Sequence, residues 1–321
     1  MAWRLRLVPV KTNIDFFKLQ YITFGASAVA MVLSVVLVLG LNLGIDFKGG
    51  TTIRTESSQA VDVGAYREAL SRLDLGDVTI SEVFDPSFRD DQHVAMVRIA
   101  PVDGEEVVTP EGIREVEAAL QTVDPSITFP AVESVGPKVS KELIWQALLA
   151  VAAGSLGILA YVWVRFEWQF AVGTVAALIH DVLVTVGVFS LFQLKFDLSI
   201  VAALLTILGY SVNDTVVIFD RLRENLAKYK QMPLREMMNL TANETLSRTI
   251  MTASTTLIAL IILLIFGGDV IRGFVFAMTF GVIIGTYSTL YVAKNIVLFL
   301  GLNRGDKPRQ ADKNEFANVD A

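Results

Sequence analysis

The sequence predicts an all-α membrane bundle of six helices with one inserted α+β domain. Three observations predict this fold class. Hydrophobic residues make up 53% of the 321 residues, charged residues only 19%, and the mean hydropathy is +0.54, which is too apolar for a soluble chain of this length. Six stretches are long and apolar enough to cross about 30 Å of hydrocarbon. Another stretch, directly after the first of these, is acidic and patterned like a water-soluble domain.

The six apolar stretches set the expected domain boundaries. They lie at residues 19–42, 142–164, 168–194, 198–219, 248–268 and 273–300. The remaining segments are a tail over 1–18, the inserted domain over 43–141, a loop over 220–247 and a tail over 301–321. The first stretch is longer than the apolar core of a cleaved signal peptide, which covers about 7–15 residues, so we expect it to stay as an anchor.

Lysine and arginine in the flanking segments predict the orientation in the membrane. The two tails and the loop over 220–247 are rich in these residues, whereas the short loops on the opposite side offer only Lys195 and Arg272. We therefore expect both termini in the cytoplasm and the inserted domain on the extracytoplasmic side of the membrane.

The inserted domain alternates between strand and helix patterns. Strands are expected at 51–56, 78–84, 93–100 and 127–135, and helices at 61–73 and 109–123. Thr109-Pro110-Glu111 is a typical helix start, because threonine caps a helix and proline suits its first turn. The order β-α-β-β-α-β is typical of a ferredoxin-like sandwich. No residue pattern of a chemical site is present, and His93 is expected to be a surface residue.

Composition excludes several functions. The absence of cysteine excludes disulfides and thiolate chemistry, and two histidines are too few for a histidine-rich metal centre. A formal charge of −6 excludes a basic nucleic-acid binder. Because phosphate-loop, serine-hydrolase and zinc-protease motifs are missing, we expect neither an enzyme nor a bound cofactor. The proton gradient is the expected energy source, since one charge crossing 100 mV releases about 2.3 kcal/mol.

Charged residues within the apolar stretches are the candidate functional residues, because a charge there costs at least a few kcal/mol. Asp214 lies about 9 Å inside the cytoplasmic end of the fourth stretch, at about 1.5 Å per residue. Arg248 opens the fifth stretch on the same side. Two interpretations stay open: a static ion pair between helices, or a proton relay in which the distance of the guanidinium sets the proton affinity of the carboxyl group.

Secondary candidates accompany this pair. Asn213 precedes Asp214, while His180 and Asp181 lie near the middle of the third stretch, where a local pair or an interhelical hydrogen bond is the simpler interpretation. Small residues such as Gly281 and Gly285 are spaced for close helix packing. Lys294 is expected at the inner interface, where a long side chain snorkels to the headgroups.

Several motifs resemble the SecD/SecF family of the bacterial Sec protein-export machinery, which belongs to the RND superfamily. The matching residues are Gly44, Asp46, Phe47, Gly49 and Gly50 after the first stretch, Gly136 and Pro137 before the second, and Gly209, Asp220 and Arg221 in the fourth. Residues 243–250 and 285–288 complete the set, and Ser140 departs from the glycine that is common at its position.

The resemblance implies a bacterial inner membrane, with the inserted domain on its periplasmic side. It also implies an RND-type half core that acts with SecD, beside the SecYEG channel and YajC, on a translocating polypeptide. In this family the matching aspartate and arginine conduct protons, which implies the relay at Asp214 and Arg248. The function so implied is an accessory subunit that uses the proton motive force to promote late steps of polypeptide export. Two alternatives stay open: a proton-driven exporter of small molecules or lipids, and a scaffold subunit that transports nothing.

Overall fold

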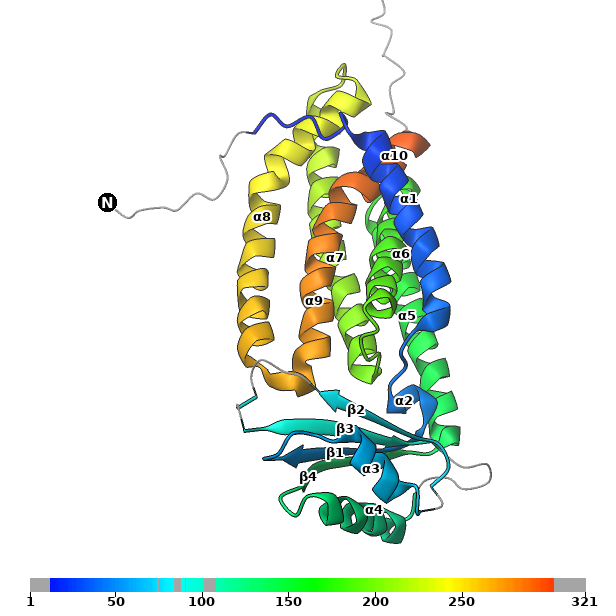
Figure 1. Cartoon of the computed structure of the whole chain (residues 1–321). Helices are drawn as coiled ribbons and strands as arrows, with labels where there is room; N and C mark the ends of the chain where they lie inside the picture. The colour runs from blue at the N-terminus through cyan, green and yellow to red at the C-terminus, as the bar shows by residue number, and fades with distance from the viewer. Residues whose placement is uncertain (1–11, 74, 84–87, 90, 101–107, 303–321) are drawn as a thin grey trace, which may run out of the picture.

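Six long helices form a bundle, and a four-stranded sheet with its own helices covers one end of it (Figure 1). Figure 1 shows a computed structural model of the chain, which describes residues 12–73, 75–83, 88–89, 91–100 and 108–302. The long helices are α1 Gln20–Leu37, α5 Pro137–Arg165, α6 Trp168–Leu191, α7 Leu198–Lys228, α8 Leu234–Phe266 and α9 Gly268–Ser288. Within the described residues, six helical segments are long and apolar enough to cross a membrane, which confirms the predicted six-helix membrane bundle.

The last of the six spans is not a uniform α-helix. After α9 the chain continues as a π-helical turn, η2 Thr289–Ala293, and then as α10 Lys294–Leu300. The sequence predicts one unbroken helix over 273–300, because hydropathy does not report hydrogen-bond geometry. Single π-turns inside α-helices occur frequently at functional sites.

The helices divide into a central and a peripheral set. In α6, α7 and the last span, between 50% and 56% of the apolar window is buried within the chain, whereas in α1, α5 and α8 the buried share lies between 6% and 17%. The apolar side chains of the peripheral set are exposed, which suits lipid or another membrane subunit. The central set therefore forms the interior in which a polar group is shielded from lipid.

The end of α7 and the start of α8 differ from the boundaries that the sequence predicts. The loop expected over 220–247 is largely helical, because α7 continues to Lys228 and α8 begins at Leu234. Consequently Arg248 lies near the middle of α8 and does not open a helix. Hydropathy marks only the apolar part of a helix, and the added turns of α8 are amphipathic: they bury Met237 and Met238 and expose Glu236.

The sheet domain, residues 45–135, follows α1. Its elements are α2 Ile45–Lys48, β1 Gly50–Ser57, α3 Val63–Leu70, β2 Val78–Val83, β3 His93–Ile99, α4 Pro110–Val123 and β4 Thr128–Val135. The strands pair antiparallel in the order β2-β3-β1-β4. Thr109 caps α4 by accepting a hydrogen bond from Gly112 N–H, as its Thr-Pro-Glu start predicts.

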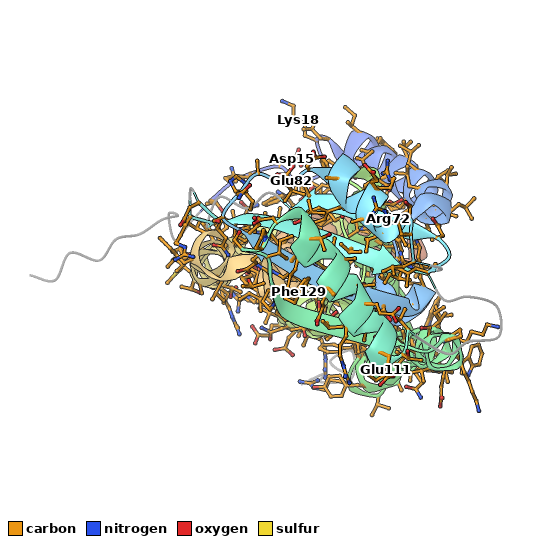
Figure 2. All side chains as sticks on the ribbon, turned by 60° about the horizontal axis from the view of Figure 1, so that its bottom comes forward. Asp15, Lys18, Arg72, Glu82, Glu111 and Phe129 are labelled. Carbon is orange, nitrogen blue, oxygen red and sulfur yellow. The ribbon has the colours of Figure 1, made fainter. Side chains whose placement is uncertain are left out.

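The two longer helices of the sheet domain cover the face of the sheet that points away from the bundle (Figure 1). Between them and the sheet lies an apolar core that includes Ile53, Val97, Leu70 and Leu120. Figure 2 looks onto this side, where the exposed Glu111 lies at the start of α4. The sheet therefore lies between its own helices and the bundle. It covers the end of the bundle at which α1 ends and α5 and α7 begin.

Candidate functional site

Asp214 is a buried carboxylate on the central helix α7. Its exposed fraction is 4%, and its Oδ2 has no hydrogen-bond partner within the described part of the chain. An isolated ionised carboxylate in an apolar interior costs several kcal/mol. Such a group is retained for a function or changes its protonation state.

Arg248 on α8 is exposed and makes no ion pair with Asp214 in the described residues, although its charge acts on that carboxyl group. The static ion pair that the sequence leaves open therefore has no support in this geometry. An arginine on a flexible stem can approach or leave a neighbouring carboxylate without a change of fold.

Asp181 is the opposite case, because its carboxylate is fully enclosed and fully bonded. Its exposed fraction is 0%. Oδ2 accepts hydrogen bonds from Ser211 Oγ at 2.7 Å and Ser288 Oγ at 2.9 Å, and Oδ1 lies 3.0 Å from His180 Nδ1. The carboxylate thus joins α6, α7 and the end of α9 at one point.

Small residues make this approach of three helices feasible. A Cβ atom on Gly285 would lie 3.2 Å from Ser211 Cβ, and one on Gly281 would lie 2.4 Å from Ile207. Directly beyond Ser288, Thr289 of the π-helical turn η2 shares a hydrogen bond of 2.9 Å with Thr215 of α7. The polar contacts between α7 and the last span therefore continue to the residue next to Asp214.

A second polar contact links this cluster to α1. Tyr287 Oη donates to Thr23 O at 2.8 Å and lies 3.0 Å from Ser27 Oγ. The Tyr287 ring packs on the buried His180 ring with centroids 6.0 Å apart. His180 and Asp181 thus serve interhelical contacts, which the sequence offers as their simpler interpretation.

The remaining motif residues lie outside this cluster. Gly209 and Asn213 share an exposed face of α7. Near the end of the bundle at which the described chain begins and ends, Asp220 lies 3.4 Å from Arg165, and Arg221 bridges Glu224 and Glu244. These pairs are at least partly exposed, and those with Arg165 and Glu244 connect α7 to α5 and α8.

The glycine-rich motifs lie at the other end of the bundle. Gly44 precedes α2, while Gly49 and Gly50, with φ of +72° and +102°, lead into β1. Gly136 caps α5 and Pro137 opens it. None of these residues contacts Asp214 or Asp181 in the described hydrogen-bond network.

Lys294 is enclosed by the chain, so the predicted snorkelling of its side chain to the headgroups is wrong. It is 1% exposed, and its Nζ lies 4.0 Å from the Phe17 ring and 5.0 Å from the Phe16 ring. Snorkelling is prevented because the chain before α1 folds over it: Asn243 bonds both backbone groups of Ile14 at 2.8 Å. Cation–π contacts of a desolvated ammonium contribute about 2 kcal/mol or more.

Sequence reasoning missed the partners of Asp181 and the burial of Lys294. Ser211 and Ser288 do lie in segments that carry the family resemblance, but only the tertiary fold brings serines 107 and 30 residues away to one carboxylate. The burial of Lys294 gives no signal in the sequence, because the two rings that enclose it, Phe16 and Phe17, belong to the opposite end of the chain.

Two family models match parts of the chain, and curated relatives match it over nearly its full length. A family model described as protein export membrane protein SecD/SecF, C-terminal, matches residues 115–303, and one described as the SecD/SecF GG motif matches residues 35–61. Curated relatives called protein translocase subunit SecF are 70% identical in Cereibacter sphaeroides, over 100% of both chains, and 63% identical in Rhodobacter capsulatus, over 99% of this chain and 98% of the relative.

Solved structures give the same relation. A crystal structure of SecDF from Thermus thermophilus, called there a translocon-associated membrane protein, matches with a TM-score of 0.81 at 34% identity. A SecDF crystal structure in a super-membrane-facing form matches with a TM-score of 0.64, also at 34% identity. Each match covers 92% of this chain but only 39% or 40% of the SecDF chain.

The fold and the site define a multi-pass membrane protein of the transport class. The sequence identity of 70% with a protein translocase subunit SecF, over the full length of both chains, defines the family within this class. The chain belongs to the SecF family of protein translocase subunits. It is therefore a transport protein and not an enzyme.

Proposed function

We propose that the chain acts with SecD as one half of an RND-type core, in which proton movement through the membrane promotes late steps of polypeptide export. The observation that carries this proposal is the buried carboxylate of Asp214 on a central helix, whose Oδ2 has no hydrogen-bond partner among the described residues. The relatives and SecDF structures support the pairing with SecD, because this chain accounts for 39% of a SecDF chain that it matches closely.

The chemistry assigned to Asp214 is the binding and release of one proton. In the neutral state the carboxyl group is compatible with its apolar surroundings. In the ionised state it needs a cation, and Arg248 is the group whose charge reaches it. Alternation between these states lets a proton enter from one side of the membrane and leave toward the other, driven by about 2.3 kcal/mol per charge and 100 mV.

The orientation follows from charge. We infer that the end of the bundle at which the described chain begins and ends is cytoplasmic and that the sheet domain is periplasmic. In the sequence, lysine and arginine gather in the two terminal segments and in the α7–α8 connection. The sheet domain is proposed to be ferredoxin-like, which its strand order β2-β3-β1-β4 with helices on one face supports.

The partners are inferred from the family. We propose contacts with SecD, the SecYEG channel, YajC, the translocating polypeptide and membrane lipid, and none with nucleic acid. The exposed apolar faces of α1, α5 and α8 are suited to lipid or a second membrane subunit. No bound cofactor is required for this role, since the proton gradient supplies the energy.

Export in cells that carry only an Asp214→Asn variant tests the proposal, because asparagine keeps the shape and removes the titratable group. Precursors of secreted proteins are expected to accumulate although the variant still co-purifies with SecD. Glu224→Gln is the matched control, since it neutralises a carboxylate on the same helix whose side chain is 59% exposed. Undisturbed export in Asp214→Asn would contradict the proposal and support the scaffold alternative. Undisturbed export together with a loss of small-molecule or lipid efflux would support the exporter alternative.

A further inference from the structure

The connection between the sheet domain and the bundle, here called the neck, consists of residues 42–50 and the facing residues 196–198. One of its side chains contacts the start of α7. Asp46 Oδ2 accepts a hydrogen bond of 2.8 Å from Leu198 N–H, although the two residues are 152 positions apart. Leu198 is the first residue of α7, the helix that carries Asp214. We propose that Asp46 is a positioning residue that transmits displacement of α7 to the sheet domain. The proposal rests on the proposed function of Asp214.

Backbone contacts place Asp46 for this role. Gly44 N–H donates to Phe196 O at 2.7 Å, and Phe196 N–H donates to Asn42 O at 2.8 Å. A Cβ on Gly44 would lie 3.1 Å from Asp197 Cβ and 3.2 Å from Phe196 O. The glycine therefore allows the chain leaving α1 to lie directly against the residues that precede α7.

The same end of α7 is held by a second carboxylate, and the two have different tasks. Asp197 is the local cap, because it accepts hydrogen bonds from Ser199 and Ile200 N–H. Asp46 belongs to α2 and accepts a hydrogen bond from Leu198 N–H, a helix-start donor that the Asp197 cap does not bond. The Phe47 and Phe196 rings pack beside it with centroids 5.9 Å apart. Asp46 is thus the polar part of a joint whose apolar part is this ring pair.

On its other side the neck is closely packed. A Cβ on Gly49 would lie 3.2 Å from Val135 O and 3.4 Å from Pro137 Cα. The first and last strands of the sheet domain therefore meet at the start of α5. Because α2 lies between this crossing and α7, a shift of the α7 start acts on the sheet domain through α2.

The long path from Asp214 to the neck is a single helix. α7 runs without interruption from Leu198 to Lys228, and packed helices carry displacements along their axis. The two SecDF structures match this chain at the same identity and over the same 92% of its length, yet with TM-scores of 0.81 and 0.64. Those two structures thus differ in geometry over the part that this chain matches.

A distance measurement in the full complex with SecD tests the inference. The chain has no cysteine, so paired spin labels at Glu111→Cys on α4 and Phe192→Cys at the end of α6 report the position of the sheet domain. When Asp46 is present, Asp214→Asn is expected to shift the distance between the two labels relative to the labelled protein that keeps Asp214. With Asp46→Ala the same substitution is expected to cause no shift.

Three further variants keep the inference falsifiable if Asp46→Ala does not assemble. Leu198→Pro removes the bond from the donor side, since proline lacks the N–H and is tolerated at the first helical position; it should abolish the shift. Asp46→Asn keeps an acceptor oxygen and should retain the shift, as should Asp197→Ala, the matched control at the same helix end. A shift that persists in Asp46→Ala or Leu198→Pro would overturn the inference and leave the role of Asp214 intact. No shift with the intact neck, together with normal export, would instead overturn the proposed function.

Discussion

Asp181 and Asp214 are both buried carboxylates on the central helices, yet their surroundings are opposite. Asp181 is enclosed by two serine hydroxyls and a histidine nitrogen that join three helices. Asp214 has an oxygen without a partner among the described residues, and the cation that acts on it lies on an exposed face of another helix. A carboxylate with all its donors stabilises one arrangement, whereas one without them is suited to changing its state.

The contrast assigns two tasks to one polar region. The Asp181 cluster holds α6, α7 and the last span together. Asp214 lies on the same α7, and its Oδ2 makes no hydrogen bond within the described part of the chain. Thr215, directly after Asp214, bonds to Thr289 in the π-helical turn η2. The fixed cluster and the residue proposed to bind protons are therefore neighbours along α7, so that a change at Asp214 acts on a firmly packed helix.

The largest expected effect comes from Asp181→Ala. It removes the shared partner of Ser211, Ser288 and His180, of which Ser288 keeps a bond to Gly285 O, and it should cost about 3–5 kcal/mol. Asp214→Ala should cost far less, because no hydrogen bond in the described residues depends on it. Thermal unfolding of the two variants in detergent measures the difference, and equal losses of stability would remove the distinction between the carboxylates.

A third buried charge extends the comparison. Replacing Phe17 by Leu removes the ring nearest to the Lys294 ammonium and should destabilise the packing of residues 12–18 by about 1–2 kcal/mol. The same change in a Lys294→Met background should cost clearly less, because no buried cation remains to be enclosed. Limited proteolysis of the N-terminal segment is compared in the wild type, the two single variants and the double variant, which gives the coupling energy between Phe17 and Lys294. Identical losses of stability from Phe17→Leu in both backgrounds would contradict a cation–π role.

The link between α7 and the π-helical turn should have a smaller effect. Thr215→Val deletes one hydroxyl while Thr289 keeps its bond to Gly285 O at 2.9 Å, so we expect a loss of about 1 kcal/mol. The unfolding temperature reports this change. A loss as large as that of Asp181→Ala would mean that the turn, and not the carboxylate, holds the helices.

A carboxylate outside the membrane completes the series. The pKa of Asp124 lies below its ordinary value of 3.8 because Ser57 and Ser126 donate hydrogen bonds to the ionised form. Its stabilisation of the sheet domain is therefore present above that value and is lost as pH falls through the lowered pKa. Pulse proteolysis of the full chain in urea should show this acid loss in the wild type and a flatter profile in Asp124→Asn; parallel profiles would refute it.

The sequence predicts the large features because they depend on local composition. Hydropathy locates six spans, and Thr109-Pro110 predicts the start of α4, since both signals lie within neighbouring residues. Hydropathy cannot predict that α8 begins at Leu234, because amphipathic turns outside the apolar window are stabilised by packing against other elements. The burial of Lys294 and the three donors of Asp181 depend on residues brought together only by the fold.

The most direct test of the account asks which carboxyl group takes up a proton. Infrared difference spectra of the protein between acidic and neutral pH report the stretch of protonated carboxyl groups, and Asp181→Asn and Asp214→Asn assign it. We predict that one membrane-buried carboxyl signal is lost in Asp214→Asn and kept in Asp181→Asn. A signal that remains in Asp214→Asn and disappears in Asp181→Asn would contradict the account and transfer the proton-binding role to the enclosed carboxylate.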